Sequence, residues 1–343
     1  MVRHGSDRGY DVVGVRRETF RRNAIASTRI KANPMTRTAS FSTFMIIFGV
    51  LFSSPSIAQQ YSDTLFTPNV SSPAFRHGTG PAVLIDEAHN NFHTMEGRYL
   101  PFARLLQKDG YVVAPQRTRF VRTDLERAQI LVIANALPGG TQDAEILPTA
   151  SAFDSAEIAT VREWVNDGGS LWLIADHMPF AGAAESLAVQ FGILLSNGFA
   201  LDAGTEEGLM HFTRSDGSLA DHPVTRGRNP SEHIDSVVAF TGQAFRFDGP
   251  GEALMTLGRN VDLLLPQVAW QFSPLTPRIS ASGMLQGGVV RFGKGRVAVF
   301  GEAAMFSAQI AEPGHRRAGM NSRLAPQNAQ FLLNVAHWLS GLL

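Results

Sequence analysis

Short apolar runs alternate with helix-like segments through most of this chain, and this alternation limits the folds that it can adopt. Each run is four or five residues long and is bounded by polar or turn-forming residues, as buried strands of a parallel sheet are. The expected strands are 82–85, 111–114, 130–134, 171–175 and 296–300. The expected helices are 96–109, 181–191, 328–339 and one that starts at Asp154 or Ser155 and stops at Gly168. This alternation predicts an α/β fold with right-handed crossovers.

The pattern weakens from residue 193 to about residue 285. Only 237–240 and 253–257 are expected strands there. Residues 287–300 then predict a hairpin that turns at Gly293-Lys294-Gly295. Long irregular insertions in compact domains often cover a functional site. We therefore expect residues 193–285 to form an irregular, β-rich insertion that covers a functional site.

Residues 35–58 have the layout of a secretory signal peptide. A basic start leads into the apolar run 41–52, and Ser56-Ile57-Ala58 provides small residues for cleavage after Ala58. A membrane anchor is the alternative, but the apolar run is short for a span. The predicted location is periplasmic or secreted, with no stable membrane span after signal cleavage.

The remaining boundaries follow from composition. Residues 1–34 are rich in arginine and lack apolar periodicity, so we expect an untranslated or disordered extension. Residues 59–80 are rich in Ser, Pro, Thr and Asn, which predicts an extended lead-in. One α/β domain is expected from 80 to 343, with the insertion at about 193–285.

Charge and cysteine content exclude several classes of protein. The chain has 30 basic and 30 acidic residues, but nine basic and three acidic residues lie in 1–58, which leaves 21 against 27 and a net charge of −6 beyond it. A mildly acidic body argues against a nucleic-acid partner. The chain has no cysteine, so any metal must be held by His, Asp or Glu. No G-x-x-x-x-G-K-[ST] loop is present, so no nucleotide is expected although 86–89 reads Asp-Glu-Ala-His.

The stretch 161–177, from Val161 through Gly168-Gly169 to Asp176-His177, resembles the class I glutamine amidotransferase-like superfold. The closing segments 295–302 and 337–339 add to this resemblance. It is most similar to non-amidotransferase secreted branches, such as the trehalose-utilisation-like proteins. The resemblance implies a flavodoxin-like, mostly parallel sheet with helices on both faces. True amidotransferases carry a nucleophilic cysteine at the turn that is Asp176-His177 here, so glutamine hydrolysis by that mechanism is excluded.

Polar residues follow three of the expected strands. Because the carboxyl ends of parallel strands meet at one edge of a sheet, these residues should lie close together. Asp86, Glu87, His89 and His93 follow the first strand, Asp176 and His177 follow the fourth, and Glu302 follows the last.

Histidines and carboxylates without thiols suit Zn²⁺ or another divalent metal. We assign His89, His93 and His177 as metal ligands, with Asp86 or Asp176 as a fourth ligand or as a partner that orients one of them. Glu302 or Glu87 would be the general base, and Asp176 is a further catalytic candidate. Such a site predicts a hydrolase, possibly metal-dependent, that acts on an amide, ester or glycosidic bond.

Each of these side chains also has a purely structural explanation. Asp86 and Asp176 can cap turns, Glu302 can pair with an arginine, and HxxxH spacing without a catalytic Glu occurs by chance. The alternative function is therefore a non-catalytic envelope protein that binds a small molecule, sugar or peptide in the same cleft.

Overall fold

The structure is a computed structural model that describes residues 60–139, 145–205, 209–312 and 314–343. The predicted extension 1–34 and the predicted signal peptide 35–58 lie outside the described residues. None of the described helices is both long and apolar enough to cross a membrane.

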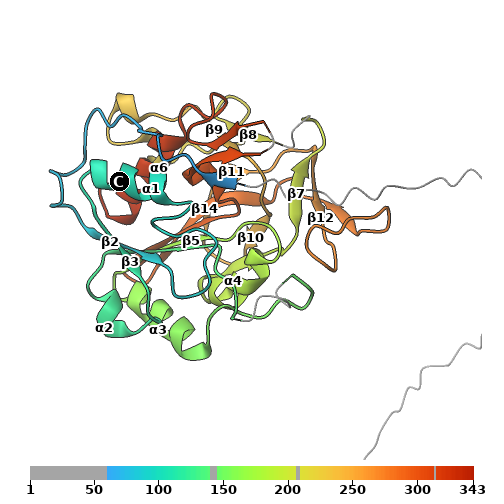
Figure 1. The fold of residues 1–343 in the computed structure, drawn as a ribbon, viewed down its shortest axis with the longest axis horizontal. Coiled ribbons are helices and arrows are strands. Elements are labelled where there is room, and N and C mark those ends of the chain that lie inside the picture. Colours follow the sequence, from blue (N-terminus) through green and yellow to red (C-terminus); the bar gives the residue numbers. More distant parts are fainter. Residues whose placement is uncertain (1–59, 140–144, 206–208, 313) are drawn as a thin grey trace, which may run out of the picture. The chain divides into compact units, whose positions relative to one another are not determined.

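Five parallel strands form one half of a nine-stranded sheet (Figure 1). Their order is β3-β2-β4-β5-β15. The first of these five strands in the chain, β2, therefore lies between β3 and β4. All four neighbouring pairs are parallel. Each of the five predicted strands is present, within about two residues of its expected bounds. They are β2 (Ala82–Asp86), β3 (Val112–Gln116), β4 (Ile130–Ala134), β5 (Ser170–Ile174) and β15 (Gly295–Phe300).

The other half of this sheet is antiparallel. The predicted hairpin is confirmed, because β14 pairs with β15 across the turn at Gly293-Lys294. Beyond β14 the sheet continues through β10 and β6, and β11 also pairs with β14. The sheet is therefore mixed, and the predicted flavodoxin-like parallel arrangement applies only to its first half. These strands are β14 (Leu285–Phe292), β10 (Phe245–Phe247), β6 (Ile193–Leu195) and β11 (Glu252–Thr256).

Helices cover both faces of the sheet, α1 and α6 on one and α2, α3 and α4 on the other (Figure 1). Alternation along each strand explains this arrangement: Val83 and Ile85 join the core under α1 and α6, whereas Leu84 joins the core under α3 and α4. The helices are α1 (Leu100–Lys108), α2 (Arg122–Leu125), α3 (Ser155–Asn166), α4 (Phe180–Ala188) with the 3-10 turn η1 (Val189–Phe191), and α6 (Asn328–Leu339).

The inserted region is rich in strands, as expected, but it does more than cover the domain. Its strands β6 and β10 extend the main sheet, and the expected strands 237–240 and 253–257 appear as β9 and β11. Two smaller sheets, β13-β12-β7 and β8-β9, lie outside the main one. The elements not yet bounded are β7 (Phe199–Asp202), β8 (Met210–Thr213), α5 (Pro223–Arg226), η2 (Pro230–Glu232), β9 (Ser236–Ala239), β12 (Val261–Leu264) and β13 (Arg278–Ser280).

The described part of the lead-in, residues 60–80, contains one short strand. β1 (Gln60–Ser62) pairs antiparallel with β16 (Ala308–Ala311), which also pairs with β17 (Arg316–Gly319). The turn η3 (Ala304–Phe306) lies between β15 and this three-stranded sheet in the chain. It begins two residues after Glu302, which itself follows β15.

Candidate functional site

The polar residues that follow the parallel strands lie at one edge of the sheet. Asp86 is the last residue of β2, Asp176 follows β5, and Glu302 follows β15. Asp176 interacts electrostatically with the Glu302 carboxyl, and His177 interacts electrostatically with His93. Side chains far apart in the sequence are thus brought together, and their contacts decide what each one can do.

His89 is held between two carboxylates. Its Nδ1 lies 2.9 Å from Asp86 Oδ1 and its Nε2 lies 2.9 Å from Glu157 Oε1. Carboxylates only accept hydrogen bonds, so both ring nitrogens must carry a hydrogen and His89 is an imidazolium. Burial lowers the pKa of His89, but the hydrogen bonds and charges of Asp86 and Glu157 outweigh burial and raise it. A ring that donates through both nitrogens has no lone pair for a metal.

Glu157 ties the loop that carries His89 to the start of α3. It is the third residue of that helix and forms a capping box with Asp154. Its carboxylate also accepts hydrogen bonds from the backbone N–H of Phe120 at 3.0 Å and from Arg119 Nη2 at 3.0 Å. Every one of these contacts is internal, so Glu157 acts as a structural anchor for His89.

His93 is buried and neutral. Asn135 accepts the backbone N–H of Asp176 through Oδ1 at 2.9 Å, and its Nδ2 lies 3.2 Å from His93 Nδ1. Nδ1 of His93 is therefore an acceptor, and its Nε2 faces the carboxamide of Gln309 at 3.5 Å. Burial, together with the nearby Arg98 guanidinium and the His177 ring, lowers the pKa of His93 to about 3. Neither nitrogen is directed at solvent or at another predicted ligand.

Glu302 and Asp176 are both buried, with exposed fractions of 0% and 6%. The Glu302 carboxyl accepts the backbone N–H groups of Ala304 and Met305, each at 2.7 Å, and so caps η3. Burial and the neighbouring Asp176 raise the pKa of Glu302 well above its ordinary value. Asp176 Oδ1 accepts the backbone N–H of His177 at 2.8 Å. Within the described residues its Oδ2 has no hydrogen-bond partner.

Glu87, the other predicted base, is held at both of its oxygens. Its Oε1 accepts the backbone N–H of Met95 at 2.9 Å, and its Oε2 accepts from Arg117 Nε at 3.2 Å. Arg117 is largely exposed, so the pair lies at the surface. Glu87 therefore fastens the loop after β2 to its neighbours.

The predicted metal ligands do not form one coordinating set. His89 donates through both nitrogens, His93 accepts from Asn135, and His177 donates from Nδ1 to the carbonyl of Met178 at 2.8 Å. Over the part of the chain that the structure describes, no three His, Asp or Glu side chains are placed to hold a metal ion. The four-ligand assignment does not fit this geometry, and metal dependence stays a prediction. We name the buried, internally bonded side chains the strand-end cluster: Asp86, His89, His93, Glu157 and Glu302.

His177 belongs to a different environment, a continuous row of aromatic rings. Its ring stacks on Phe199 at 4.7 Å and meets Trp270 edge-on at 4.5 Å. On its other side Phe180 lies at 5.8 Å, and Phe92 follows at 5.5 Å from Phe180. We name this row the aromatic rim: Phe92, Phe180, His177, Phe199, Trp270 and Phe272, the last of which is 5.1 Å from Phe199.

Three rings of the aromatic rim are open to solvent. Phe92, Trp270 and Phe272 are 42%, 42% and 43% exposed, although large apolar side chains are normally buried. The buried ring of Phe180 contacts Phe92, and the buried ring of Phe199 contacts Trp270 and Phe272. Because the Nδ1 of His177 is a donor, its Nε2 is left as an acceptor beside the exposed rings. The rim thus combines apolar ring faces with polar acceptors, the composition typical of small-molecule sites.

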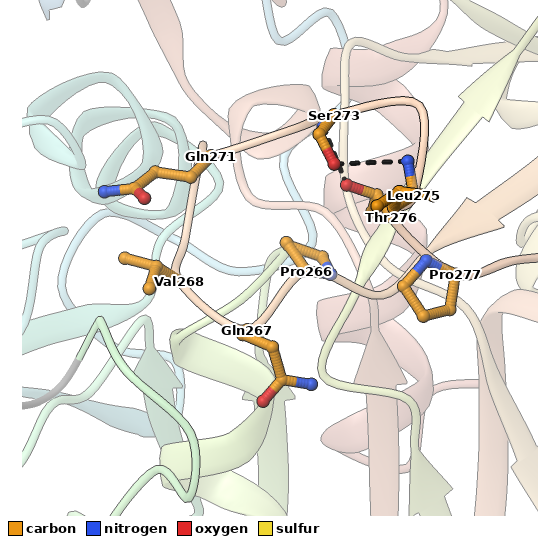
Figure 2. A pocket seen from close by; sticks show the side chains of 8 residues that line it. All are labelled: Pro266, Gln267, Val268, Gln271, Ser273, Leu275, Thr276 and Pro277. Carbon is orange, nitrogen blue, oxygen red and sulfur yellow. Dashed lines mark hydrogen bonds between the residues drawn. The ribbon is translucent and has the colours of Figure 1, made fainter.

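The loop 266–277 carries Trp270 and Phe272 and is held in place by hydrogen bonds within the loop and by one to Glu145. Ser273 bonds to Leu275 and Thr276, as Figure 2 shows, and Ala269 donates its backbone N–H to the Glu145 carbonyl at 2.8 Å. The same loop lines a hollow of about 190 Å³. Trp270 has a φ of 64°, a left-handed conformation that is unfavourable for a bulky residue. Such strain costs about 1–3 kcal/mol and tends to occur where a ligand binds.

Sequence reasoning named His177 but missed the rings around it. The available signal was Trp270-Gln271-Phe272, two aromatic residues in a segment without strand or helix periodicity. Asn135, Glu157 and Gln309 were also missed, because nothing local distinguishes them from ordinary surface residues.

The comparisons with known proteins are informative about the fold alone. No family model matches the chain, and no curated protein matches it. Among solved structures, the N-terminal domain of mmIFT52 is similar with a TM-score of 0.54 at 13% identity, over 75% of this chain and 97% of that domain. At this identity the likeness indicates a shared fold and nothing about activity.

Two further similar structures have lower scores. A cytoplasmic protein from Salmonella typhimurium has a TM-score of 0.46 at 12% identity, over 76% of this chain and 98% of its own. A ThuA-like protein from Bacteroides uniformis has a TM-score of 0.41 at 13% identity, over 80% of this chain and 94% of its own. Structures similar to this chain thus include a member of the trehalose-utilisation-like group, at scores too low to support an inference.

Proposed function

We propose that this protein binds a carbohydrate at the aromatic rim, without chemistry, as a secreted or envelope protein. We also propose that it belongs to the class I glutamine amidotransferase-like superfold, with its flavodoxin-like sheet. Within that superfold it would belong to a non-amidotransferase branch such as the trehalose-utilisation-like proteins. The observation that carries the proposal is the contrast in exposure at the sheet edge. The imidazoles of His89 and His93 and the carboxyl of Glu302 are buried in internal bonds, whereas Phe92, Trp270 and Phe272 of the rim are 42–43% exposed.

The chemistry of a sugar matches the rim. One face of a sugar ring presents C–H groups, whose slightly positive hydrogens are attracted to the negative face of an aromatic ring. Its hydroxyl groups need acceptors, and Asp176 Oδ2 and His177 Nε2 supply two beside the rings. The strained conformation of Trp270 also supports a functional role, because a ring placed only for stability would not require it.

Tryptophan fluorescence tests this proposal directly. Trp164, Trp172 and Trp338 are at most 4% exposed, so a sugar at the rim would change mainly the emission of Trp270. A panel of neutral and acidic oligosaccharides is titrated against the full chain. Because Trp270→Gly lacks this reporter, its binding is measured by titration calorimetry, and it should be weaker by about tenfold or more, equivalent to about 1.4 kcal/mol.

The matched control is Leu275→Ala, which removes a 91% exposed apolar side chain from the same loop. This control should bind as the wild type does. Trp270→Gly also relieves the left-handed strain that Trp270→Ala would keep, so the glycine variant should be the more stable of the two by about 1 kcal/mol. If no sugar in the panel binds, or if Trp270→Gly binds normally, the proposal is wrong.

Hydrolysis is the second candidate function, and one observation favours it. Asp176 and Glu302 interact, and the raised pKa of Glu302 would keep it protonated beside a charged carboxylate, the pairing that an acid and a base require. Asp176→Asn should then abolish turnover of a glycoside, ester or amide substrate. Absence of turnover across all three substrate classes, with and without added divalent metal, would eliminate this candidate.

A further inference from the structure

We propose that Arg98 binds the carboxylate of an acidic sugar at one end of the aromatic rim. This inference rests on the proposed sugar-binding function and adds the chemical class of the ligand. Three features of Arg98 carry it: its position beside Phe92, its incomplete hydrogen bonding, and the lack of an acidic partner among the described residues.

Arg98 lies against the exposed end of the rim. Its guanidinium carbon is 3.7 Å from the centroid of the Phe92 ring, which is a cation–π contact. Arg98 and His177 both interact electrostatically with the buried ring of His93. Arg98 is therefore close to the part of the site where Phe92, Phe180 and His177 follow one another.

The hydrogen-bonding capacity of Arg98 is mostly unused. Its Nη1 lies 3.4 Å from the carbonyl of Phe92, which is a long contact, and its Nε is buried without a partner in the part of the chain that the structure describes. A guanidinium carries five N–H donors in a planar fork that matches a carboxylate. A buried donor without a partner is costly, so a ligand oxygen that reached this fork would gain free energy.

Other partly buried arginines are satisfied by the protein itself. Arg228 bonds to the Glu232 carboxylate, which raises the pKa of Arg228. Arg296 donates to the backbone carbonyls of Trp338, in the last turn of α6, and of Leu343, beyond its end. Burial lowers the pKa of Arg98, and no carboxylate acts against that effect. Arg98 is thus an unpaired, half-buried cation, the state in which a guanidinium most favours an external anion.

The order of groups along the rim selects a sugar carboxylate. The ring contacts run from Phe92 through Phe180 and His177 to Trp270, and the Arg98 guanidinium lies on Phe92. A ligand that fits this order carries an anion at one end, hydroxyl groups in its middle and an apolar ring face at the other end. An oligosaccharide with a uronic acid residue has these three features.

The test compares a glucuronate-containing disaccharide with its neutral glucose counterpart, by titration against the full chain. The wild type should bind the acidic sugar at least about tenfold more tightly, and added salt should reduce this preference. Arg98→Met keeps the apolar stem on Phe92 and should abolish the preference for the acidic sugar. Arg98→Lys keeps the charge but not the fork, so it should retain only part of the preference.

The matched control is Arg117→Gln, which removes a positive charge from the same edge but leaves Arg98 in place. Its preference for the acidic sugar should equal that of the wild type. Equal binding of both sugars by the wild type would overturn the inference and leave the sugar-binding function intact, whereas binding of neither would overturn that function. Competition by inorganic phosphate but not by acetate would also overturn the assignment to a carboxylate.

Discussion

The strand-end cluster and the aromatic rim occupy the same edge of the sheet but differ in how their side chains are satisfied. In the cluster, His89, His93 and Glu302 are buried and bonded to neighbours in the protein. In the rim, Trp270 is exposed and strained, and Arg98 retains a donor without a partner. Unused capacity, rather than a concentration of reactive residue types, separates the surface that can bind a ligand from the one that holds the loops together.

The same comparison can be made between two histidines four residues apart. His89 lies between carboxylates and has a raised pKa, whereas His93 lies among amides and aromatic rings and has a lowered pKa. Their residue type and spacing suggested one shared role as ligands. Their surroundings give them opposite charge states, because local partners rather than residue type determine which protonation state is favoured.

The largest expected effect is on stability, from removal of the carboxylate that holds His89. Glu157→Ala leaves the His89 imidazolium and the Phe120 N–H without this partner, and loss of one member of a buried pair costs about 3–5 kcal/mol. The change is measured as the free energy of unfolding in denaturant. Trp270→Gly, in the rim, should change that free energy far less.

Asp154→Ala is the matched control for this variant. It removes the other half of the capping box but leaves the contact between His89 and Glu157, so it should cost only about 1 kcal/mol. If both variants lose the same stability, the helix cap accounts for the whole effect and the strand-end cluster does not depend on Glu157.

A smaller effect, of about 1.4 kcal/mol per pH unit at most, is expected from His93. Its pKa is about 3 in the folded chain and near the ordinary value of 6.5 in the unfolded chain. Between these values the unfolded state binds the extra proton, so His93 destabilises the fold as the pH falls from 6.5 towards 3. Denaturant unfolding of the wild type and of His93→Gln at several pH values measures this contribution.

The two slopes should diverge below pH 6.5, with the wild type losing stability faster than His93→Gln. His77→Gln provides the control, because His77 is exposed in the folded chain and should not produce such a divergence. Parallel slopes for the wild type and His93→Gln would mean that His93 is accessible to protons, which would remove the contrast between the cluster and solvent-exposed groups.

Local patterns predicted the elements of the α/β core well. The five parallel strands and the closing helix α6 were found because each apolar run or periodic stripe is a local signal. Strands β6 and β10 were not predicted to join the main sheet, because each has only three residues and pairs with partners far away in the chain. The roles assigned at the strand ends depended on contacts such as Glu157 with His89, 68 residues apart, which no local pattern encodes.

The amino-acid sequence by itself determined the alternating strands and helices, their burial on both faces and the gathering of polar residues at the carboxyl edge. It could do so because hydrophobic periodicity is written in consecutive residues. Tertiary structure decided which of those residues became internal supports and which surface stayed open. It alone brought Arg98, His177 and Trp270 together, because side-chain pairing and solvent exposure depend on neighbours that the chain supplies from distant segments.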